Sequence, residues 1–360
     1  MFTAHVGHRT DDWKGVSGWL AIADGRSSIL FAMVAGVSLA IVTGRRTPVS
    51  GPRLVQARTR LLVRSVLLLA VAGLLDLLGT PVYLILGYYA AFFVLALPFL
   101  RWTPRRLAIT AGVVGVVGPV ACQWGGEALL RSGLRPPMDG TGALGDFLLF
   151  GHYPALAWMA YVFAGMAIGR LDLSSPTLGW GLLAGGAGVA SVFYGLSALI
   201  TGRAGGRTAV DAAASTWSIR AGNPELTWGD PWPTLTYQWI AGPHTNTWAE
   251  VFGSGGFAAA ILGLCLLLGR RIPRALAPIA ATGAMALSVY CAQIVAIYVW
   301  GAAAVQQTTN WPLLVMVLIT LACTTAWRAF LGRGPLERLL GMVATRSSTV
   351  RDNVAPEPAR

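Results

Sequence analysis

Nine apolar stretches, most of them without any charge, dominate this chain. They lie at about 27–43, 61–78, 81–100, 107–123, 147–169, 177–200, 251–268, 275–300 and 311–331. Each is close to the length that an α-helix needs to cross a hydrocarbon core of about 30 Å. Strands of a membrane barrel would be shorter and would alternate in polarity, which these stretches do not. The sequence therefore predicts an all-α, polytopic membrane helix bundle with about nine spans.

Composition and charge distribution agree with a membrane location. Only 12% of the residues are charged, against roughly 25% in soluble proteins. The net charge of +12 would by itself fit a nucleic-acid-binding protein, but nineteen of the 27 lysines and arginines lie in alternate connections between the apolar stretches. This is the positive-inside pattern. It predicts a multi-pass protein of the cell membrane with the lipid bilayer as partner, a cytoplasmic C-terminus and no nucleic-acid partner.

The spacing of the stretches predicts one transmembrane domain over residues 1–331 and a cytoplasmic, partly disordered tail at 332–360. Two connections on the outer side are long, at 124–146 and 201–250, and loops of that length are usually functional. The tail begins with RGPLERLLGMVATR, which is typical of a short basic helix on the inner leaflet. The first residues, FTAHV, resemble the last turn of a helix. A further span before them would raise the count to ten.

Asp24 and Arg26 stand directly before the first uncharged stretch. That stretch is rich in small residues, which let helices approach closely and favour a place inside the bundle. The predicted topology puts the pair on the outer face, together with all four histidines of the chain. We therefore predict that Asp24 and Arg26 are catalytic and that His5 is a general base near them. Anchoring at the membrane interface is the alternative for the charged pair.

Two other stretches carry polar residues at their outer mouths. His152 and Tyr153 stand at one, and His244 and Glu250 at another. Glu250 falls in the first turn, where the helix dipole favours a carboxylate, and the two residues can act as base and orienter. We predict that His152 and His244 are catalytic and that Tyr153 and Glu250 bind substrate. Histidines that merely end a helix are the alternative.

Asp76 and Gln293 are polar residues within apolar stretches. A carboxylate there is costly and usually faces the bundle interior, although the turn just after Asp76 also allows a place at the interface. Gln293 is typical of a hydrogen bond between membrane helices. We predict that both residues bind substrate, with these structural roles as alternatives.

No metal site is expected. The four cysteines lie in or at the ends of apolar stretches without metal-binding spacing, which is typical of packing residues. Phosphate-binding loops, GxSxG and HExxH are absent. Gly181 and Gly185 have the small-xxx-small spacing of close helix contacts. That contact fits either the bundle itself or a homo-oligomer.

Four segments carry a resemblance to known proteins. They are DGRSSILFAMVAGVSLA, HYPALAWMAYVFAGMAIGRL, PHTNTWAEVFGSGGFAAAILGLCLLL and GAMALSVYCAQ, in this order. Together they resemble the heparan-alpha-glucosaminide N-acetyltransferase-like family of the transmembrane acyltransferase superfamily, and related bacterial membrane domains of unknown function. Where the lysosomal member has its catalytic histidine, shortly before the DGR-like element, this chain has Lys14. His5 and His8 lie nearby.

The resemblance implies acyl transfer across the membrane. Acyl-CoA would be the co-substrate on the cytoplasmic side, and a small-molecule or glycan acceptor would approach from outside. A histidine would deprotonate the acceptor or carry the acyl group, while Arg26 would hold an oxyanion or another anionic group. Arg45, Arg46 and Arg105 would meet CoA phosphates, unless they only set topology. The alternative is a small-molecule transporter or flippase-like protein without transferase activity.

Overall fold

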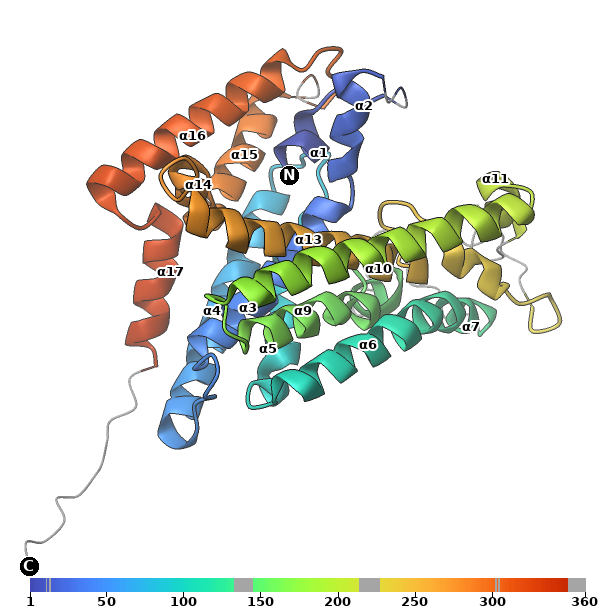
Figure 1. The fold of residues 1–360 in the computed structure, drawn as a ribbon, viewed down its shortest axis with the longest axis horizontal. Coiled ribbons are helices and arrows are strands. Elements are labelled where there is room, and N and C mark those ends of the chain that lie inside the picture. The colour runs from blue at the N-terminus through green and yellow to red at the C-terminus, as the bar shows by residue number, and fades with distance from the viewer. Residues whose placement is uncertain are drawn as a thin grey trace, which may run out of the picture.

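The computed structural model describes residues 1–10, 12, 14–132, 145–213, 227–301, 303 and 305–348. Every regular element in this part of the chain is helical, which confirms the all-α fold (Figure 1). The longer helices are α3 (Arg26–Val42), α4 (Gly51–Asp76), α5 (Leu86–Ala96), α6 (Pro104–Val120), α9 (Ala155–Gly169), α10 (Pro176–Arg203), α13 (Trp248–Arg271), α14 (Ala277–Ala284), α15 (Ala286–Trp300), α16 (Trp311–Leu331) and α17 (Pro335–Arg346). The shorter ones are α1 (Phe2–Val6), α2 (Val16–Leu20), η1 (Ala21–Ala23), η2 (Leu97–Phe99), η3 (Ala121–Gly125), α7 (Gly126–Arg131), η4 (Asp146–Phe150), α11 (Arg207–Ala213) and η5 (Leu235–Trp239).

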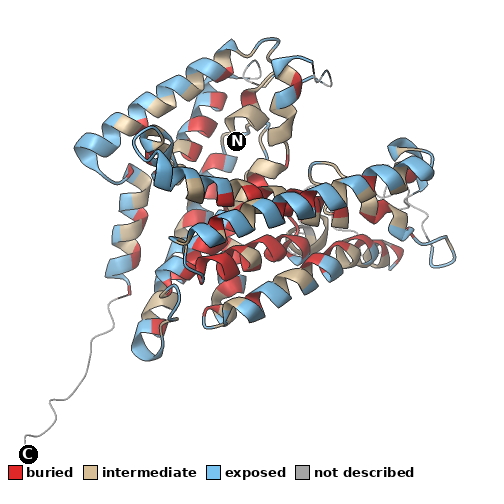
Figure 2. Ribbon diagram, viewed as in Figure 1, coloured by how far each residue is buried: buried red, intermediate tan, exposed pale blue. Residues whose placement is uncertain are grey.

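Helix α9 forms the centre of the bundle. Thirteen of its fifteen residues are buried, and Figure 2 shows it as a largely red ribbon among paler helices. Helices α3, α6 and α13 pack against it. A Cβ atom on Gly165 would lie 1.9 Å from the carbonyl oxygen of Met33, and one on Gly36 would lie 2.1 Å from that of Val162. Only glycine allows α3 and α9 to cross this closely, so α3 lies inside the bundle as its small residues predict.

A second close contact joins α10 and α13. A Cβ atom on Gly186 would lie 2.5 Å from the carbonyl oxygen of Gly256, and the reciprocal distance is 2.7 Å. Gly181 and Gly185 instead face open space. Their small-xxx-small spacing therefore makes no close helix contact within the described part of the chain, and the homo-oligomer stays a prediction.

The prediction of about nine full spans is only partly supported. Helices cover all nine apolar stretches, but five segments are long and apolar enough to cross a membrane, or six if the pair α14–α15 counts as one. Helix α9 and the pair α5–η2 are shorter. Helix α4 is long, but it carries Arg60 and Arg64 in its middle turns and Asp76 at its last residue. Apolar length alone overestimated the spans because it ignores where helices end and which charges they include.

Helices α14 and α15 bend by 81° at the break between them. The start of α15 is capped by Glu337 from α17. Its Oε1 accepts hydrogen bonds from the backbone N–H of Leu287 at 2.8 Å and of Ser288 at 3.0 Å, and its Oε2 accepts one from the Ser288 hydroxyl at 2.5 Å. These bonds satisfy N–H groups that a helix start leaves unpaired. Helix α17 thereby fixes the broken span.

The two long connections, which the sequence suggests are loops, and the tail contain short helices. Helices α7, α11 and η5 lie within the two long connections, η4 begins at the end of the first, and α17 is the helix predicted at the start of the tail. Residues 133–144 and 214–226 of the connections, and residues 349–360, where disorder is predicted, lie outside the described residues.

Candidate functional site

Two histidines from segments far apart in the sequence meet at the ends of α9 and α13. His152 precedes α9, which begins at Ala155, and His244 precedes α13, which begins at Trp248. Their ring centroids lie 4.0 Å apart at an interplanar angle of 33°. The Tyr83 ring stacks on the other side of His152, with centroids 4.2 Å apart and planes 9° apart. Tyr83 is 68% exposed, so the stack runs from the surface into the bundle.

Aromatic side chains enclose the inner side of His244. The ring of buried Tyr153 meets it edge-on at 5.2 Å, and the buried indole of Trp158 lies parallel to it at 6.2 Å. The Trp158 indole N–H donates to Oδ1 of Asn246 at 2.8 Å. The segment before α13 is therefore held against α9 by both ring packing and a hydrogen bond.

The Glu250 carboxylate shapes the turn that carries His244. Its Oε1 accepts a hydrogen bond from the His244 backbone N–H, and its Oε2 accepts one from that of Asn246, both at 2.6 Å. His244 and Asn246 have φ values of 58° and 54°, a region that non-glycine residues seldom adopt and that clusters at functional sites. Thr247 caps α13 by accepting from the Glu250 N–H at 3.2 Å. Glu250 thus holds a strained turn in place.

This geometry corrects the predicted pairing of His244 with Glu250 as base and orienter. The carboxylate bonds to the backbone of His244, whereas Nδ1 of its ring is buried and has no hydrogen-bond partner among the described residues. Glu250 is 2% exposed. It orients His244 through the main chain and not through the imidazole.

The environment keeps the His244 imidazole neutral. Burial, and after it the charge of His152, lower the pKa of His244 from 6.5 to about 3, although a backbone hydrogen bond with His152 acts the other way. A backbone acceptor holds the ring proton on the nitrogen that faces it. Because Nδ1 has no partner, this favours the tautomer with the lone pair on Nδ1.

The Asp24–Arg26 turn packs against the same segment. Gly25 has φ +65°, and a Cβ atom there would lie 3.0 Å from Cα of Pro243 and 3.3 Å from Oε1 of Glu250. Asp24 forms an ion pair with Arg9. Gly25 therefore brings the two charged residues on either side of it to the base of the His244 turn.

Arg26 points into a polar contact between helices. Its Nε donates to the Tyr194 hydroxyl at 2.8 Å and its Nη1 to the carbonyl oxygen of Ile22 at 3.1 Å. The guanidinium also lies 5.7 Å from the ring centroid of Phe257. The Tyr194 hydroxyl is in turn 2.8 Å from Oγ of Ser254. Arg26 stands at the first residue of α3, where the helix dipole adds to its positive charge.

Three predicted residues lie away from the histidine pair. Nδ1 of His5 is 3.1 Å from Nε2 of Gln293, so these two form a contact of their own between α1 and α15. The expectation that Asp76 faces the interior is wrong, because its side chain is exposed at the last residue of α4. The interface alternative fits that position. Lys14 is exposed as well.

The structure thus joins His152, Tyr153, His244 and Glu250, with the Asp24–Arg26 turn beside them. Sequence reasoning missed Tyr83, Asn246 and Tyr194, which contact these residues from other segments. The one available indication was the PHTN sequence before α13, where Asn246 favours a left-handed backbone. No group of three or more metal-binding side chains occurs among the residues described.

Two family models match different halves of the chain. A family model described as heparan-alpha-glucosaminide N-acetyltransferase, catalytic, matches residues 3–186, which is about half of the chain and includes His152. A second, described as protein of unknown function (DUF418), matches residues 210–346 and includes His244. No curated protein and no solved structure matches the chain. The apolar helices and these matches make it an acyltransferase-like membrane protein. The chain belongs to the heparan-alpha-glucosaminide N-acetyltransferase catalytic family, and its C-terminal part is similar to the DUF418 model.

Proposed function

We propose that this protein transfers an acyl group from acyl-CoA to a small-molecule or glycan acceptor at the His152–His244 pair. The observation that carries the proposal is the neutral His244 ring, whose buried Nδ1 has no hydrogen-bond partner among the described residues. A buried polar atom without a partner costs about 1–3 kcal/mol. Such an atom in a strained turn is typical of a reactive group. Because Nδ1 is shielded, the aromatic side chains around it must move apart when substrate binds.

The Nδ1 lone pair can serve in two ways. As a base, it takes the proton of the acceptor hydroxyl or amine while that atom bonds to the thioester carbonyl carbon, and the C–S bond breaks to release CoA thiolate. As a nucleophile, it bonds to the carbonyl carbon itself and CoA thiolate leaves. The acceptor then displaces the imidazole and loses its proton. In both routes the thiolate finally takes up one proton.

The lowered pKa affects both routes. A pKa of about 3 for His244 makes it a weak base at neutral pH, where a general base works best with a pKa near the ambient pH. Nucleophilic attack needs only the neutral ring, which this environment supplies. A low pKa also weakens a nucleophile, so labelling of the protein in the absence of acceptor is the observation that distinguishes the routes.

Arg26 can act as the anion-binding group in this reaction. Its charge stands at the start of α3, whose dipole has the same sign. The Asp24 carboxylate forms its ion pair with Arg9 and not with Arg26. We assign Arg26 to the oxyanion or to an anionic group of the substrate. Arg45 and Arg46 follow the end of α3, and Arg105 is the second residue of α6. We assign these three arginines to CoA phosphates on the cytoplasmic side.

The test uses the full chain, purified in detergent, with radiolabelled acetyl-CoA and a panel of amino sugars and sugar alcohols. We expect label on the protein without acceptor, and on an acceptor once it is added. His244→Asn should abolish both. His8→Asn is the matched control, because the His8 ring contacts the carbonyl oxygen of Gln307 at 2.9 Å, outside the pair. His5→Asn should likewise retain labelling. No transfer by the unaltered protein contradicts the function, and full transfer by His244→Asn contradicts the residue assignment.

One observation favours a second function, small-molecule transport. Helices α14 and α15 are broken by 81°, and discontinuous spans are typical of transporters. The start of α15 is, however, filled by Glu337. Uptake of labelled substrate into vesicles without release of CoA would favour transport, and stoichiometric CoA release would favour transfer.

A further inference from the structure

Helix α17 begins where a candidate span ends. Helix α16 is one of the five full candidate spans, and it ends at Leu331. Gly332, with φ +77°, turns the chain into α17. The indole N–H of Trp327, in the last turns of α16, donates to the carbonyl oxygen of Arg333 at 3.1 Å. Tryptophan at a helix end is typical of the membrane–water interface, so α17 starts at the level of the lipid headgroups.

One face of α17 packs on the protein and the other does not. Leu340 and Ala344 are buried, and the helix contacts α4 and α15. Leu339 and Met342 are instead 49% and 46% exposed. Figure 1 shows α17 beside α4 and running in a different direction from α16. A short helix with this division of side chains suits the plane of the interface.

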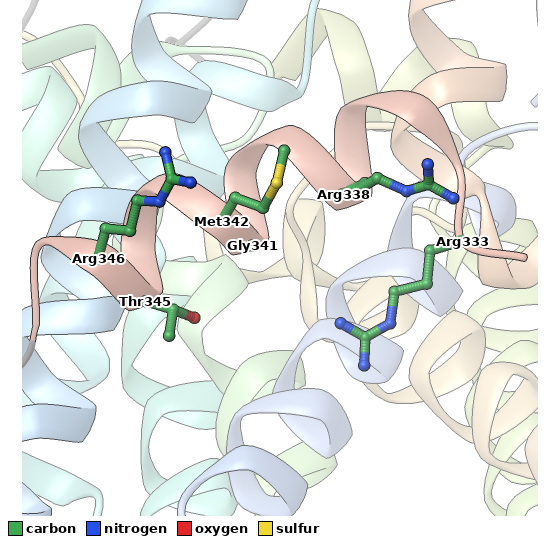
Figure 3. A pocket seen from close by; sticks show the side chains of 6 residues that line it. All are labelled: Arg333, Arg338, Gly341, Met342, Thr345 and Arg346. Atoms are coloured by element: carbon green, nitrogen blue, oxygen red, sulfur yellow. The ribbon is translucent and has the colours of Figure 1, made fainter.

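The exposed side of α17 is basic. A shallow hollow of about 290 Å³ is lined by Arg333, Arg338, Gly341, Met342, Thr345 and Arg346. Figure 3 shows Arg338 and Arg346 at opposite ends of the helix, with Arg333 on the turn before it, and the three side chains do not converge on one point. Eight residues separate Arg338 from Arg346, which is about 12 Å along a helix axis. Such spacing fits several separate anions better than one small ligand.

The one carboxylate of α17 does not neutralise this surface. Glu337 directs both oxygens to the start of α15, where they accept the hydrogen bonds from Leu287 and Ser288. Glu337 therefore adds no negative charge to the exposed face, and the apolar Leu339 and Met342 stand between its arginines. Cationic and apolar groups side by side match the headgroup and upper acyl region of an anionic leaflet.

We propose that the exposed face of α17, with Arg333, Arg338 and Arg346, is a binding site for the phosphate headgroups of anionic phospholipids. The arginines contact separate headgroups, and Leu339 and Met342 enter the boundary between headgroups and acyl chains. The contact fixes α17 to the leaflet and, through Glu337, supports the broken span. This site is independent of acyl transfer.

The test is thermal unfolding of the full chain in detergent during titration with phosphatidylglycerol, phosphatidylcholine or inorganic phosphate. Ligands that bind the folded state raise the unfolding midpoint. We expect phosphatidylglycerol to raise it at far lower concentration than phosphatidylcholine, and phosphate to have little effect. Each arginine near an anionic surface contributes a factor of about five in affinity. The double variant Arg338→Gln/Arg346→Gln should thus need roughly 25-fold more phosphatidylglycerol.

The matched control is Arg101→Gln/Arg106→Gln, which removes two exposed arginines beside the start of α6. Its titration should differ little from that of the unaltered protein. Arg333→Gln, on the turn before α17, provides a milder variant with a shift of about fivefold if the double variant does not fold. An equal shift in the control, equal stabilisation by phosphatidylcholine, or an equal effect of inorganic phosphate would each overturn the proposal.

Discussion

Glu250 holds His244 by its main chain and leaves its imidazole free of the carboxylate. The two residues are joined by a 2.6 Å hydrogen bond from the His244 N–H to Oε1 of Glu250, while the second oxygen binds the N–H of Asn246. A carboxylate that accepts bonds from both sides of a strained turn fixes its backbone. The position of the His244 ring therefore depends on a residue that does not touch it.

Replacing Glu250 by glutamine should destabilise the protein and lower its activity. The amide has one acceptor oxygen, so one of the two backbone N–H groups loses its partner, and its NH₂ group faces a donor. A buried N–H group that is left without its partner costs about 1–3 kcal/mol. We expect Glu250→Gln to lower both the unfolding midpoint and the rate of acyl transfer. Both decreases should be larger than those of the control variant, Thr245→Val. The control removes the 3.4 Å hydrogen bond from the Thr245 hydroxyl to the same carboxylate, together with the contacts of that hydroxyl to Ile240, Gly242 and Thr247. It leaves both backbone N–H bonds to Glu250 in place. Equal midpoints for the two variants would contradict this role.

His244 should contribute a rise in stability with pH between about 3 and 6.5. Burial lowers the folded-state pKa of His244 from 6.5 to about 3. Above pH 6.5 neither state is protonated at this ring, whereas between these values only the unfolded state binds the proton, so acid favours unfolding. His244→Gln should flatten this part of the pH profile of the unfolding midpoint, measured against the unaltered protein. His8→Gln should retain it, and a profile that is identical for His244→Gln and the unaltered protein would rule this explanation out.

Gly25→Ala should loosen the contact between the Asp24–Arg26 turn and the His244 segment. The φ of +65° disfavours any side chain, and the new Cβ would lie 3.0 Å from Cα of Pro243. The backbone strain alone is of order 1–3 kcal/mol. We expect a lower unfolding midpoint together with reduced acyl transfer. Gly73→Ala, in α4 with no heavy atom within 4 Å of the added Cβ, is the control and should leave both unchanged or be slightly stabilising.

The membrane fold could be predicted because its cause is local. Apolar length and small residues in the run at 27–43 are enough to indicate a helix inside the bundle, and α3 lies there. The bend after Ala284 could not be predicted, since the cap that stabilises it comes from Glu337, about fifty residues later in the chain. The same holds for the exposed position of Asp76, which depends on which face of α4 meets its neighbours.

The candidate site was predictable as separate pieces and not as one cluster. His152, His244 and the Asp24–Arg26 turn each occupy a helix mouth that the sequence marks. Their contact arises from packing of α3, α9 and α13, and it brings in Tyr83, which no pattern near His152 indicates. The hydrogen bonds of Glu250 to the backbone depend on a turn with unusual φ values, and composition alone does not specify such a turn.

Glu337→Gln should loosen the start of α15 without removing the helix. The carboxylate accepts bonds from the N–H groups of Leu287 and Ser288 and from the Ser288 hydroxyl. An amide in its place has one acceptor oxygen, so one backbone N–H loses its bond, at a cost of about 1–3 kcal/mol. We expect faster amide hydrogen exchange at Leu287 and Ser288, and a lower unfolding midpoint.

Its control is Glu127→Gln, which removes another buried carboxylate, the partner of Arg131 in an ion pair of 2.7 Å. That variant should lower the midpoint as well, but leave exchange at the start of α15 unchanged, because Glu127 lies in α7 and binds the 227–231 segment only through Arg131. Unchanged exchange at Leu287 in Glu337→Gln would mean that the broken span is held by the α14–α16 packing alone. The exchange pattern, and not the loss of stability, therefore decides whether α17 holds α15 in place.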